Sequence, residues 1–403
     1  MTTKLYDQDS HCRTFSAQVL SCTPVQGGQW HIVLDQTAFF PEGGGQPGDQ
    51  GTLDTVRVLD TRERGDAIVH ITDGPLTPGT SVTGELDWAL RFARMQCHSG
   101  EHVLSGLAHS LYGCTNVGFH MGEDQVILDF DKELTPQQLT VLEDRANQLI
   151  TENRPVTARY PTPEELAALD YRSKLDLTEQ VRIVTIAGCD VCACCAPHVT
   201  CTGEIGLVKL VDAMRHRGGI RLWMVAGRLA LADYQRKQTN IAAISAALSV
   251  QQPQAAQGVE RLKQELQTLK ETLKQTRQAL LAEKAKALPQ TPGNLCLFED
   301  GLDGTGLRVL ANAGMERCGG ICAVFAGTDQ AGYRYAMGSQ TVDLRAKAKA
   351  LHQAGAKVDL FVGFRNRDLI ILEKELRAAC TELNIVTDDG SNGRKGFVTD
   401  ALR

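Results

Sequence analysis

The sequence predicts an α+β protein in four parts: an N-terminal β-barrel, an α+β domain, a helical or coiled-coil linker and a small C-terminal α/β domain. Three observations predict this order. Short alternating segments open the chain, helical and strand patterns mix in its middle, and a heptad run of leucines precedes a final alternation of strands and helices. With 403 residues, of which 42% are hydrophobic, the chain can form roughly two to four domains with buried cores.

The first part, residues 1–90, contains short segments in which apolar and polar residues alternate. Clusters of Gly, Pro and Asp separate these segments, as turns separate antiparallel strands. The segments read FSAQVLSC, WHIVLDQTAFF, GTLDTVRVLD, AIVHITD and SVTGELD. We therefore expect a small β-barrel.

The second part, residues 91–228, combines two periods. The segments CHSGEHVLSGLAHSLYG and TPQQLTVLEDRANQLITEN have helical spacing, whereas QVILDF and VRIVTI resemble strands. This mixture predicts an α+β domain.

The third part, residues 229–289, is rich in Ala, Gln, Lys and Leu. A heptad pattern is formed by Val259, Leu262, Leu266, Leu269, Leu273, Thr276 and Leu280. Because Gln252–Pro253 and Gly258 interrupt it upstream, we expect a helical hairpin or a paired helix and not one long rod. The segment could serve as a spacer or form a homodimer.

The fourth part, residues 290–403, follows the turn-forming sequence PQTPGN. We expect strands in LCLFED, RVLANAG, ICAVFAG and YRYAMGS, and helices in KAKALHQAG and ILEKELRAACTEL. This alternation predicts a small α/β domain.

Composition restricts the location and the partners of the chain. It contains no apolar run of about 20 residues, and its N-terminus carries early charge, so we expect a cytoplasmic protein with no membrane partner. The net charge of −6 gives no general attraction to nucleic acid. Any RNA must therefore bind to local basic patches.

Two pairs of residues have the spacing of metal ligands. His98 and His102 stand four apart in a helical segment, so both imidazoles project from one face, although such a pair also occurs by chance. Cys194 and His198 are also four apart, and Pro197 favours a turn between them. Three imidazoles and one thiolate suit zinc (Zn²⁺), either in a structural site or in one that orients a substrate.

Thirteen cysteines are present, and five of them lie close together in one short segment: Cys189, Cys192, Cys194, Cys195 and Cys201. They are too close together for a disulfide framework, which indicates metal binding. The surplus thiols could instead be buried fillers, or the first four could hold an iron–sulfur cluster. Cys192 is an alternative to Cys194 as the thiolate ligand.

Three motifs resemble those of AlaX, the alanyl-tRNA editing proteins related to the editing domains of alanyl- and threonyl-tRNA synthetases. The first runs from Thr37 to Asp49 and reads TAFFPEGGGQPGD, and the second is MQCHSGEH, which ends at His102. The third, CCAPHV from Cys194, continues into TGEIG, where the family usually has CGGTHV. The order and spacing of the motifs agree with a long-form AlaX protein.

The resemblance implies one zinc ion and a hydrolase that deacylates alanine tRNA carrying serine or glycine, without ATP. No covalent nucleophile is needed, because the aminoacyl ester is reactive and a water molecule need only be oriented. A site that hydrogen-bonds the serine hydroxyl can reject alanine, which lacks it. The replacement of Gly-Gly-Thr by Cys195-Ala196-Pro197 stiffens the loop.

Further residues are candidates for roles around the substrate. Thr37 and Gln46 are candidates for discrimination, and Glu101 could act as a base or be an ordinary exposed helix residue. Arg221 lies in RGGIR, which resembles the basic segment that follows in the family. The glycines Gly43, Gly44 and Gly45 could approach a ligand or simply form a tight turn.

The C-terminal part begins like the DHH-associated domain of long AlaX proteins, but its glycine-rich run is missing. From about residue 346, AKALHQAGAKVDLFVGFRNRDLI and VTDDGSNGRKGFVTDAL resemble the NAD-binding end of dihydroorotate dehydrogenase electron-transfer subunits. Because the glycine-rich opening of a dinucleotide fold is absent, we expect no nicotinamide binding, and weaker tRNA binding than in relatives with an intact tail. The alternative functions are a metal-binding or redox protein and a noncatalytic tRNA-binding protein.

Overall fold

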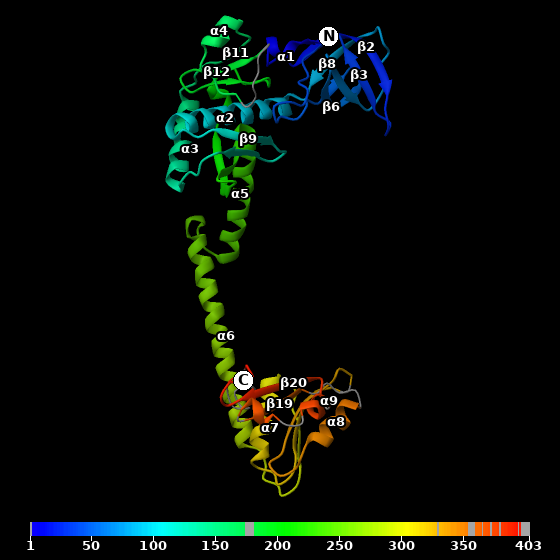
Figure 1. The fold of residues 1–403 in the computed structure, drawn as a ribbon, viewed down its shortest axis with the longest axis vertical. Helices are drawn as coiled ribbons and strands as arrows, with labels where there is room; N and C mark the ends of the chain where they lie inside the picture. Colours follow the sequence, from blue (N-terminus) through cyan, green and yellow to red (C-terminus); the bar gives the residue numbers. More distant parts are fainter. Residues whose placement is uncertain are drawn as a thin grey trace. The chain divides into compact units, whose positions relative to one another are not determined.

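The computed structural model describes residues 2–173, 181–328, 330–353, 359–364, 366–370, 373–378, 380–393 and 395. These residues form a mixed α/β structure with several sheets and helices (Figure 1). The chain divides into two compact units, Met1–Gln252 and Pro253–Arg403. Across the described ranges, no helix is both long and apolar enough to cross a lipid bilayer.

Six strands in the first unit close into a ring where the sequence predicted a β-barrel. In ring order they are β2 (Thr14–Pro24), β3 (Trp30–Leu34), β7 (Ala67–Thr72), β6 (Val56–Arg64), β5 (Gly51–Leu53) and β8 (Ser81–Leu86). Every second side chain of β2 from Phe15 to Val19 is buried, as alternation along a strand requires. These side chains pack against Ile32, Leu34 and Phe39.

Three short elements accompany the ring. They are β1 (Thr3–Lys4), α1 (Leu5–Gln8) and β4 (Gln36–Thr37). Strands β1 and β4 pair in parallel.

Helix α2 (Trp88–Tyr112) is the central helix of the first unit. Asp87 caps its N-terminus with a side chain that accepts a hydrogen bond from the Leu90 amide, and Gly113, in the left-handed region (φ 63°), caps its C-terminus. Every residue from Met95 to Ala108 is buried. A helix that is buried all round carries its polar side chains into the interior.

A four-stranded sheet and a second helix contribute to the core around α2. The strands, in sheet order, are β14 (Val208–His216), β15 (Gly219–Ala226), β10 (Val126–Phe130) and β9 (Asn116–Met121). Helix α3 (Pro136–Thr151) begins with a capping box formed by Thr135 and Gln138. Apolar side chains of α2, α3, β10 and β15 share one core.

A smaller antiparallel sheet approaches α2 and places the cysteine-rich segment beside it. Its strands are β11 (Val156–Arg159), β12 (Ile183–Ile186) and β13 (Asp190–Ala193). Two short helical elements are α4 (Pro163–Ala168) and η1 (Thr202–Ile205).

The predicted helical linker is interrupted once. Helix α5 (Gly227–Leu248) ends before Ser249, which is in the left-handed region (φ 52°), and the short turn η2 (Gln252–Gln254) contains the expected break. Helix α6 (Ala255–Lys286) then runs for 32 residues. Gly258 lies inside α6, so the expectation that it also interrupts the helix is wrong, because one glycine costs only about 1 kcal/mol in a helix.

The second unit places helix α7 against a three-stranded sheet. Strand β16 (Leu295–Phe298) pairs in parallel with β17 (Cys322–Thr328), which pairs antiparallel with β18 (Gly332–Gly338). Helix α7 (Gly304–Met315) contains RVLANAG, so the expectation of a strand there is wrong. The Asp303 side chain caps the helix, and Leu307, Leu310 and Ala311 lie buried at helical spacing.

The remaining elements are short. They are α8 (Arg345–Gln353), β19 (Asp359–Phe364), η3 (Arg367–Leu369), α9 (Glu373–Ala378) and β20 (Glu382–Thr387). Strands β19 and β20 pair in parallel. The two tail segments that resemble a reductase fall partly on 354–358, 365, 394 and 396–402, which lie outside the described residues.

Candidate metal centre

The two histidines of α2 lie one helical turn apart in the interior. The centroids of the His98 and His102 rings are 5.5 Å apart, and each residue is 2% exposed. Polar side chains at this depth require partners, because an unpaired buried polar group costs free energy. The partners come from β13 and the loop after it, and from the glycine-rich turn before β5.

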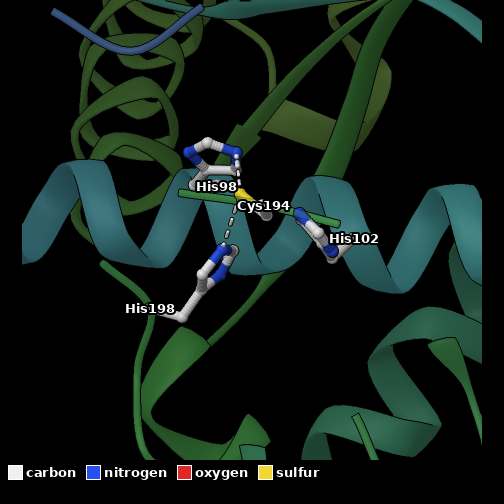
Figure 2. Close-up of side chains that lie close together, drawn as sticks. All are labelled: His98, His102, Cys194 and His198. Atoms are coloured by element: carbon white, nitrogen blue, oxygen red, sulfur yellow. Dashed lines mark hydrogen bonds between the residues drawn. The ribbon is translucent and has the colours of Figure 1, made fainter. Parts of the chain in front are cut away.

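Cys194 and His198 are carried by the loop that follows β13. The Arg182 side chain donates to the Cys194 carbonyl oxygen at 3.0 Å, and the Cys194 amide donates to the Arg182 carbonyl oxygen at 3.0 Å. At the other end of the loop, the Val199 amide donates to Ser99 Oγ of α2. The loop is therefore tied at both ends, and both side chains reach the α2 histidines (Figure 2).

The four side chains converge on one point. Cys194 Sγ lies 3.4 Å from His198 Nε2 and 3.6 Å from His98 Nε2. One ligand atom from each of His98, His102, Cys194 and His198 lies within 4.8 Å of all the others. This set, called the metal quartet below, could hold a metal ion.

The outer nitrogen of each imidazole already has a partner. His98 Nδ1 donates to Gln46 Oε1 at 2.9 Å, and His102 Nδ1 donates to Asp190 Oδ2 at 2.9 Å. His198 Nδ1 lies 3.0 Å from Ser99 Oγ. Such contacts orient ligating histidines in metalloproteins and leave the other nitrogen free to bind the ion.

The charge states of Cys194 and His198 also fit a cation. Burial alone raises the pKa of the Cys194 thiol, but the imidazoles of His98 and His198 outweigh burial and hold its pKa well below the usual value. Burial lowers the pKa of His198 to about 3, so this ring is neutral. Burial also opposes a charge on His102, but Glu101 and Asp190 raise its pKa well above the usual value, so this ring must release a proton before it can bind an ion. One thiolate, neutral imidazole and nearby carboxylates are the ligand chemistry that zinc prefers.

Glu101 faces the quartet from inside α2. Its Oε1 accepts hydrogen bonds from Ser105 Oγ and Asn116 Nδ2, both at 2.6 Å. Its Oε2 lies 3.7 Å from His102 Nε2. The residue is 4% exposed, so the reading of Glu101 as an exposed helix residue is wrong.

The glycine-rich turn brings Gln46 to His98. Gly43 and Gln46 pair across the turn, and Gly44 and Gly45 have φ of 58° and 82°. A Cβ on Gly45 would lie 2.6 Å from the Phe119 ring, and that ring packs on His98. The glycines therefore allow a close approach as well as a turn.

Gln46 and Thr37, the two candidate residues of the glycine-rich motif, differ in whether all their polar atoms have hydrogen-bond partners. Gln46 is fully buried, and its Nε2 has no hydrogen-bond partner. Thr37 is also fully buried, but its hydroxyl donates to His70 Nε2 at 2.8 Å and accepts from the Phe39 amide. An unsatisfied buried donor is an uncommon feature and indicates a missing partner.

Arg221 lies on β15, away from these hydrogen bonds. Its guanidinium pairs with both carboxylate oxygens of Asp129 at 2.7 and 2.8 Å, and it also contacts His216 Nε2. The side chain is 30% exposed.

The five crowded cysteines have different surroundings. Cys189 Sγ points to the Val103 carbonyl oxygen, Cys195 is exposed beside the glycine-rich turn, and Cys201 pairs through its backbone with Pro155. Cys192 forms a second possible ligand set with His102 and Asp190. Each set found among the described residues contains one cysteine, so the structure does not gather four thiols as an iron–sulfur cluster needs.

Sequence reasoning did not find several residues that orient the quartet. Ser99, Asp190 and Arg172 belong to this group, and Arg172 forms two hydrogen bonds with Asp190 at 2.7 Å. Asp190 is four residues before Cys194, and a carboxylate next to a ligand segment is the one available signal.

The chain is similar to known protein families over two segments. Residues 8–90 match tRNA synthetases class II (A), and residues 181–222 match the threonyl and alanyl tRNA synthetase second additional domain. The second match includes Cys194 and His198, whereas His98 and His102 lie between the two segments.

Individual relatives agree with these matches. Alanyl-tRNA editing protein Aarsd1 of Mus musculus is 28% identical over 76% of this chain and 80% of its own length. Aarsd1 of Bos taurus is 30% identical over 63% of this chain and 61% of its own length. The alanine–tRNA ligase of Ignicoccus hospitalis is 30% identical over 72% of this chain, which spans about a third of that enzyme.

These relatives give no support to the resemblance of the tail to dihydroorotate dehydrogenase electron-transfer subunits. They are alanyl-tRNA editing proteins and alanine–tRNA ligases. The chain is therefore similar both to alanyl-tRNA editing proteins and to alanine–tRNA ligases.

Proposed function

We propose that this chain hydrolyses the ester bond between alanine tRNA and a wrongly attached serine or glycine, with zinc held by the metal quartet. The observation that carries the proposal is the convergence of His98, His102, Cys194 and His198 at one buried point. The names of its relatives support the same activity. The substrate is a charged tRNA made elsewhere, and its deacylation requires only water.

The quartet fits zinc on the chemistry of its donors, and Cys194 is the better thiolate. Cys194 lies within reach of three imidazoles, whereas Cys192 groups with one imidazole and a carboxylate. Bound zinc would polarise the ester carbonyl or a water molecule. The hydrogen bonds of Gln46, Asp190 and Ser99 hold the imidazoles in the orientation for binding it.

Glu101 is the proposed proton acceptor. Ser105 and Asn116 fix its Oε1, so its Oε2 is held toward the quartet and away from solvent. A carboxylate in this position can take a proton from the attacking water at Oε2 and pass it to the leaving ribose oxygen.

Gln46 is the proposed recognition residue, with Thr37 in a second place. The unpartnered Nε2 of Gln46 can donate to an oxygen of the aminoacyl group while its Oε1 keeps the bond to His98. The Thr37 hydroxyl is already bonded to His70, so its contribution to discrimination is smaller. Rejection of alanine follows if a bond to the serine hydroxyl is required.

Two further parts of the surface are assigned to the partners. We propose that the basic segment containing Arg221 contributes to tRNA binding from β15, although Asp129 neutralises part of its charge. The atypical tail is the second part, and it is proposed to bind tRNA weakly.

We also propose that the chain divides into four parts, with boundaries at residues 90, 228 and 289.

We also propose that α6 forms a homodimer with parallel helices. The apolar heptad residues Val259, Leu262, Leu266, Leu269, Leu273 and Leu280 are between 44% and 66% exposed. The neighbouring heptad position holds Lys263, Lys270, Arg277 and Lys284. In an antiparallel pair, the basic row of one helix would lie against the same basic row of the other helix, and the like charges would repel. In a parallel pair, Glu265 lies opposite the partner's Lys270.

The assay for the proposed function compares hydrolysis of serine- and glycine-charged alanine tRNA with zinc content. We expect His98→Ala and Cys194→Ala to lose zinc and to slow hydrolysis by roughly a thousandfold, because a bound metal contributes several kcal/mol to such reactions. Glu101→Gln should keep zinc and lose activity. Cys192→Ser is the matched control, and it should keep both.

The outcomes separate the competing functions. Equal activity in all variants would refute the site, and tRNA binding without any hydrolysis by the zinc-loaded wild type would favour a noncatalytic tRNA-binding protein. Loss of zinc and activity in Cys192→Ser, but not in Cys194→Ala, would move the thiolate to Cys192.

A further inference from the structure

Asp190 and Arg172 form a chain of hydrogen bonds that leads outward from His102 of the metal quartet. Asp190 Oδ2 accepts from His102 Nδ1 at 2.9 Å and from Arg172 Nη2 at 2.7 Å, and its Oδ1 accepts from Arg172 Nε at 2.7 Å. The side chains of His102 and Asp190 are 3% and 2% exposed. The planar guanidinium therefore occupies both carboxylate oxygens at a buried position.

The backbone of Arg172 is fixed to the strand that leads to Cys194. Its amide donates to the Val191 carbonyl oxygen at 2.8 Å, and its own carbonyl oxygen accepts from the Ala193 amide at 2.9 Å. Arg172 thus lies beside β13 with little freedom to move. Its side chain is 18% exposed, and it lines a pocket of about 530 Å³ with Asp190 and Cys192.

Two possible ligand sets compete for His102. One is the metal quartet, and the other consists of His102, Asp190 and Cys192. In the second set Asp190 would have to offer an oxygen to the ion, and both of its oxygens already accept hydrogen bonds from Arg172. A guanidinium at this distance also repels a second cation.

We propose that Arg172 is a positioning residue that acts through Asp190 to orient His102 and to exclude a metal ion from the set of His102, Asp190 and Cys192. The proposal rests on the proposed metal quartet. It assigns to Arg172 no contact with the substrate. Its effect must therefore be visible in metal binding without any tRNA present.

The test is a titration of the full-length, metal-free protein with zinc and with cobalt. We expect Arg172→Gln to bind zinc about 10- to 100-fold more weakly in the quartet, as loss of an orienting contact does in other metal sites. Its cobalt spectrum should change in the thiolate charge-transfer region, because Cys192 can now join. Arg172→Lys keeps the charge without the two-pronged contact and should lie between.

A matched control is Arg154→Gln. Arg154 donates to the Ala187 and Gly188 carbonyl oxygens in the turn before β13, but it forms no hydrogen bond with Asp190. We expect wild-type zinc affinity and cobalt spectrum in this variant. Circular dichroism of each metal-free variant separates misfolding from a change in the site.

A second arm asks whether Arg172 acts through Asp190. In an Asp190→Asn background, adding Arg172→Gln should change zinc affinity by less than about twofold, because the route to His102 is already broken. Equal zinc affinity and an unchanged cobalt spectrum in folded Arg172→Gln and Arg172→Lys would overturn the inference. A wild-type protein that binds no ion would overturn the metal quartet itself, and the inference with it.

Discussion

The metal quartet and helix α6 depart from the usual distribution of residues in opposite directions. Around the quartet, His98, Glu101 and Asp190 are polar and at most 5% exposed. On α6, Leu262 and Leu269 are apolar and 54% and 66% exposed. Buried polar groups and exposed apolar rows are the informative exceptions in a fold, and each indicates a component that the chain does not supply.

The difference lies in what the missing component must be. At the quartet the outer nitrogens already have partners, so the inner nitrogens and the Cys194 thiolate call for a single cation. On α6 the exposed row extends over six apolar side chains. Only a second extended apolar surface can cover such a row.

The largest expected effect is on α6. If α6 forms the proposed dimer, we expect Leu266→Glu combined with Leu269→Glu to abolish it, because four leucines per dimer at about 1.5 kcal/mol or more each are lost from the interface. The change corresponds to a dissociation constant raised by roughly ten thousandfold. Sedimentation equilibrium measures it.

The control for this experiment adds the same charge on the outer face of the helix. Gln264→Glu with Gln267→Glu should leave the dimer intact, and neither pair of substitutions should change zinc content. If the wild type sediments as a monomer at high micromolar concentration, the leucine row has another role.

The next effect concerns Gln46, which connects the glycine-rich turn to the quartet. We expect Gln46→Glu to keep zinc, because an oxygen still accepts from His98 Nδ1, but to slow deacylation about 100- to 1,000-fold through loss of the Nε2 donor. Gln46→Leu should lose the donor and also bind zinc about 10- to 100-fold more weakly.

Rates on serine-charged tRNA and zinc affinities, measured on the same preparations, check this prediction. Thr37→Val serves as the comparison, with a smaller effect on rate and no effect on zinc. Wild-type rates in Gln46→Glu would remove Nε2 from the mechanism.

Some of the site could be predicted from sequence because its geometry is local. Two residues four apart on a helix share a face, so His98 and His102 required only the helical period of their segment. The pairing of Cys194 with His198 likewise depends on a short loop. The strands of the ring could be predicted because alternation along β2 and β8 is visible without knowledge of their partners.

The rest depends on contacts that no local pattern encodes. Gln46 and His98 are 52 residues apart, and Asp190 and His102 are 88 apart. Buried Glu101 accepts a hydrogen bond from Asn116, which lies on β9 and is 15 residues away. The helix α7 was mistaken for a strand because a short apolar segment fits both periods, and the cap at Asp303 decides between them.

The smallest expected effect tests whether buried polarity alone implies a missing ion. His70 is fully buried in the ring, but both its nitrogens have partners within the chain, the Thr37 hydroxyl and the Ile32 carbonyl oxygen. Burial lowers its pKa from 6.5 to about 4. The unfolded chain therefore binds a proton more readily than the folded chain between these values.

The sign follows directly. The contribution of neutral His70 to the free energy of unfolding is complete above pH 6.5, and about 3 kcal/mol is lost as the pH falls to about 4. For zinc-free protein, the free energy of unfolding in urea, measured at several pH values, should depend differently on pH in the wild type and in His70→Gln within that window. Because no ion takes part, adding zinc should shift both curves without changing the difference between them. If the difference between the two proteins depended on zinc, His70 would be coupled to the metal site. Buried polar groups with partners inside the chain could then no longer be distinguished from those that require an ion.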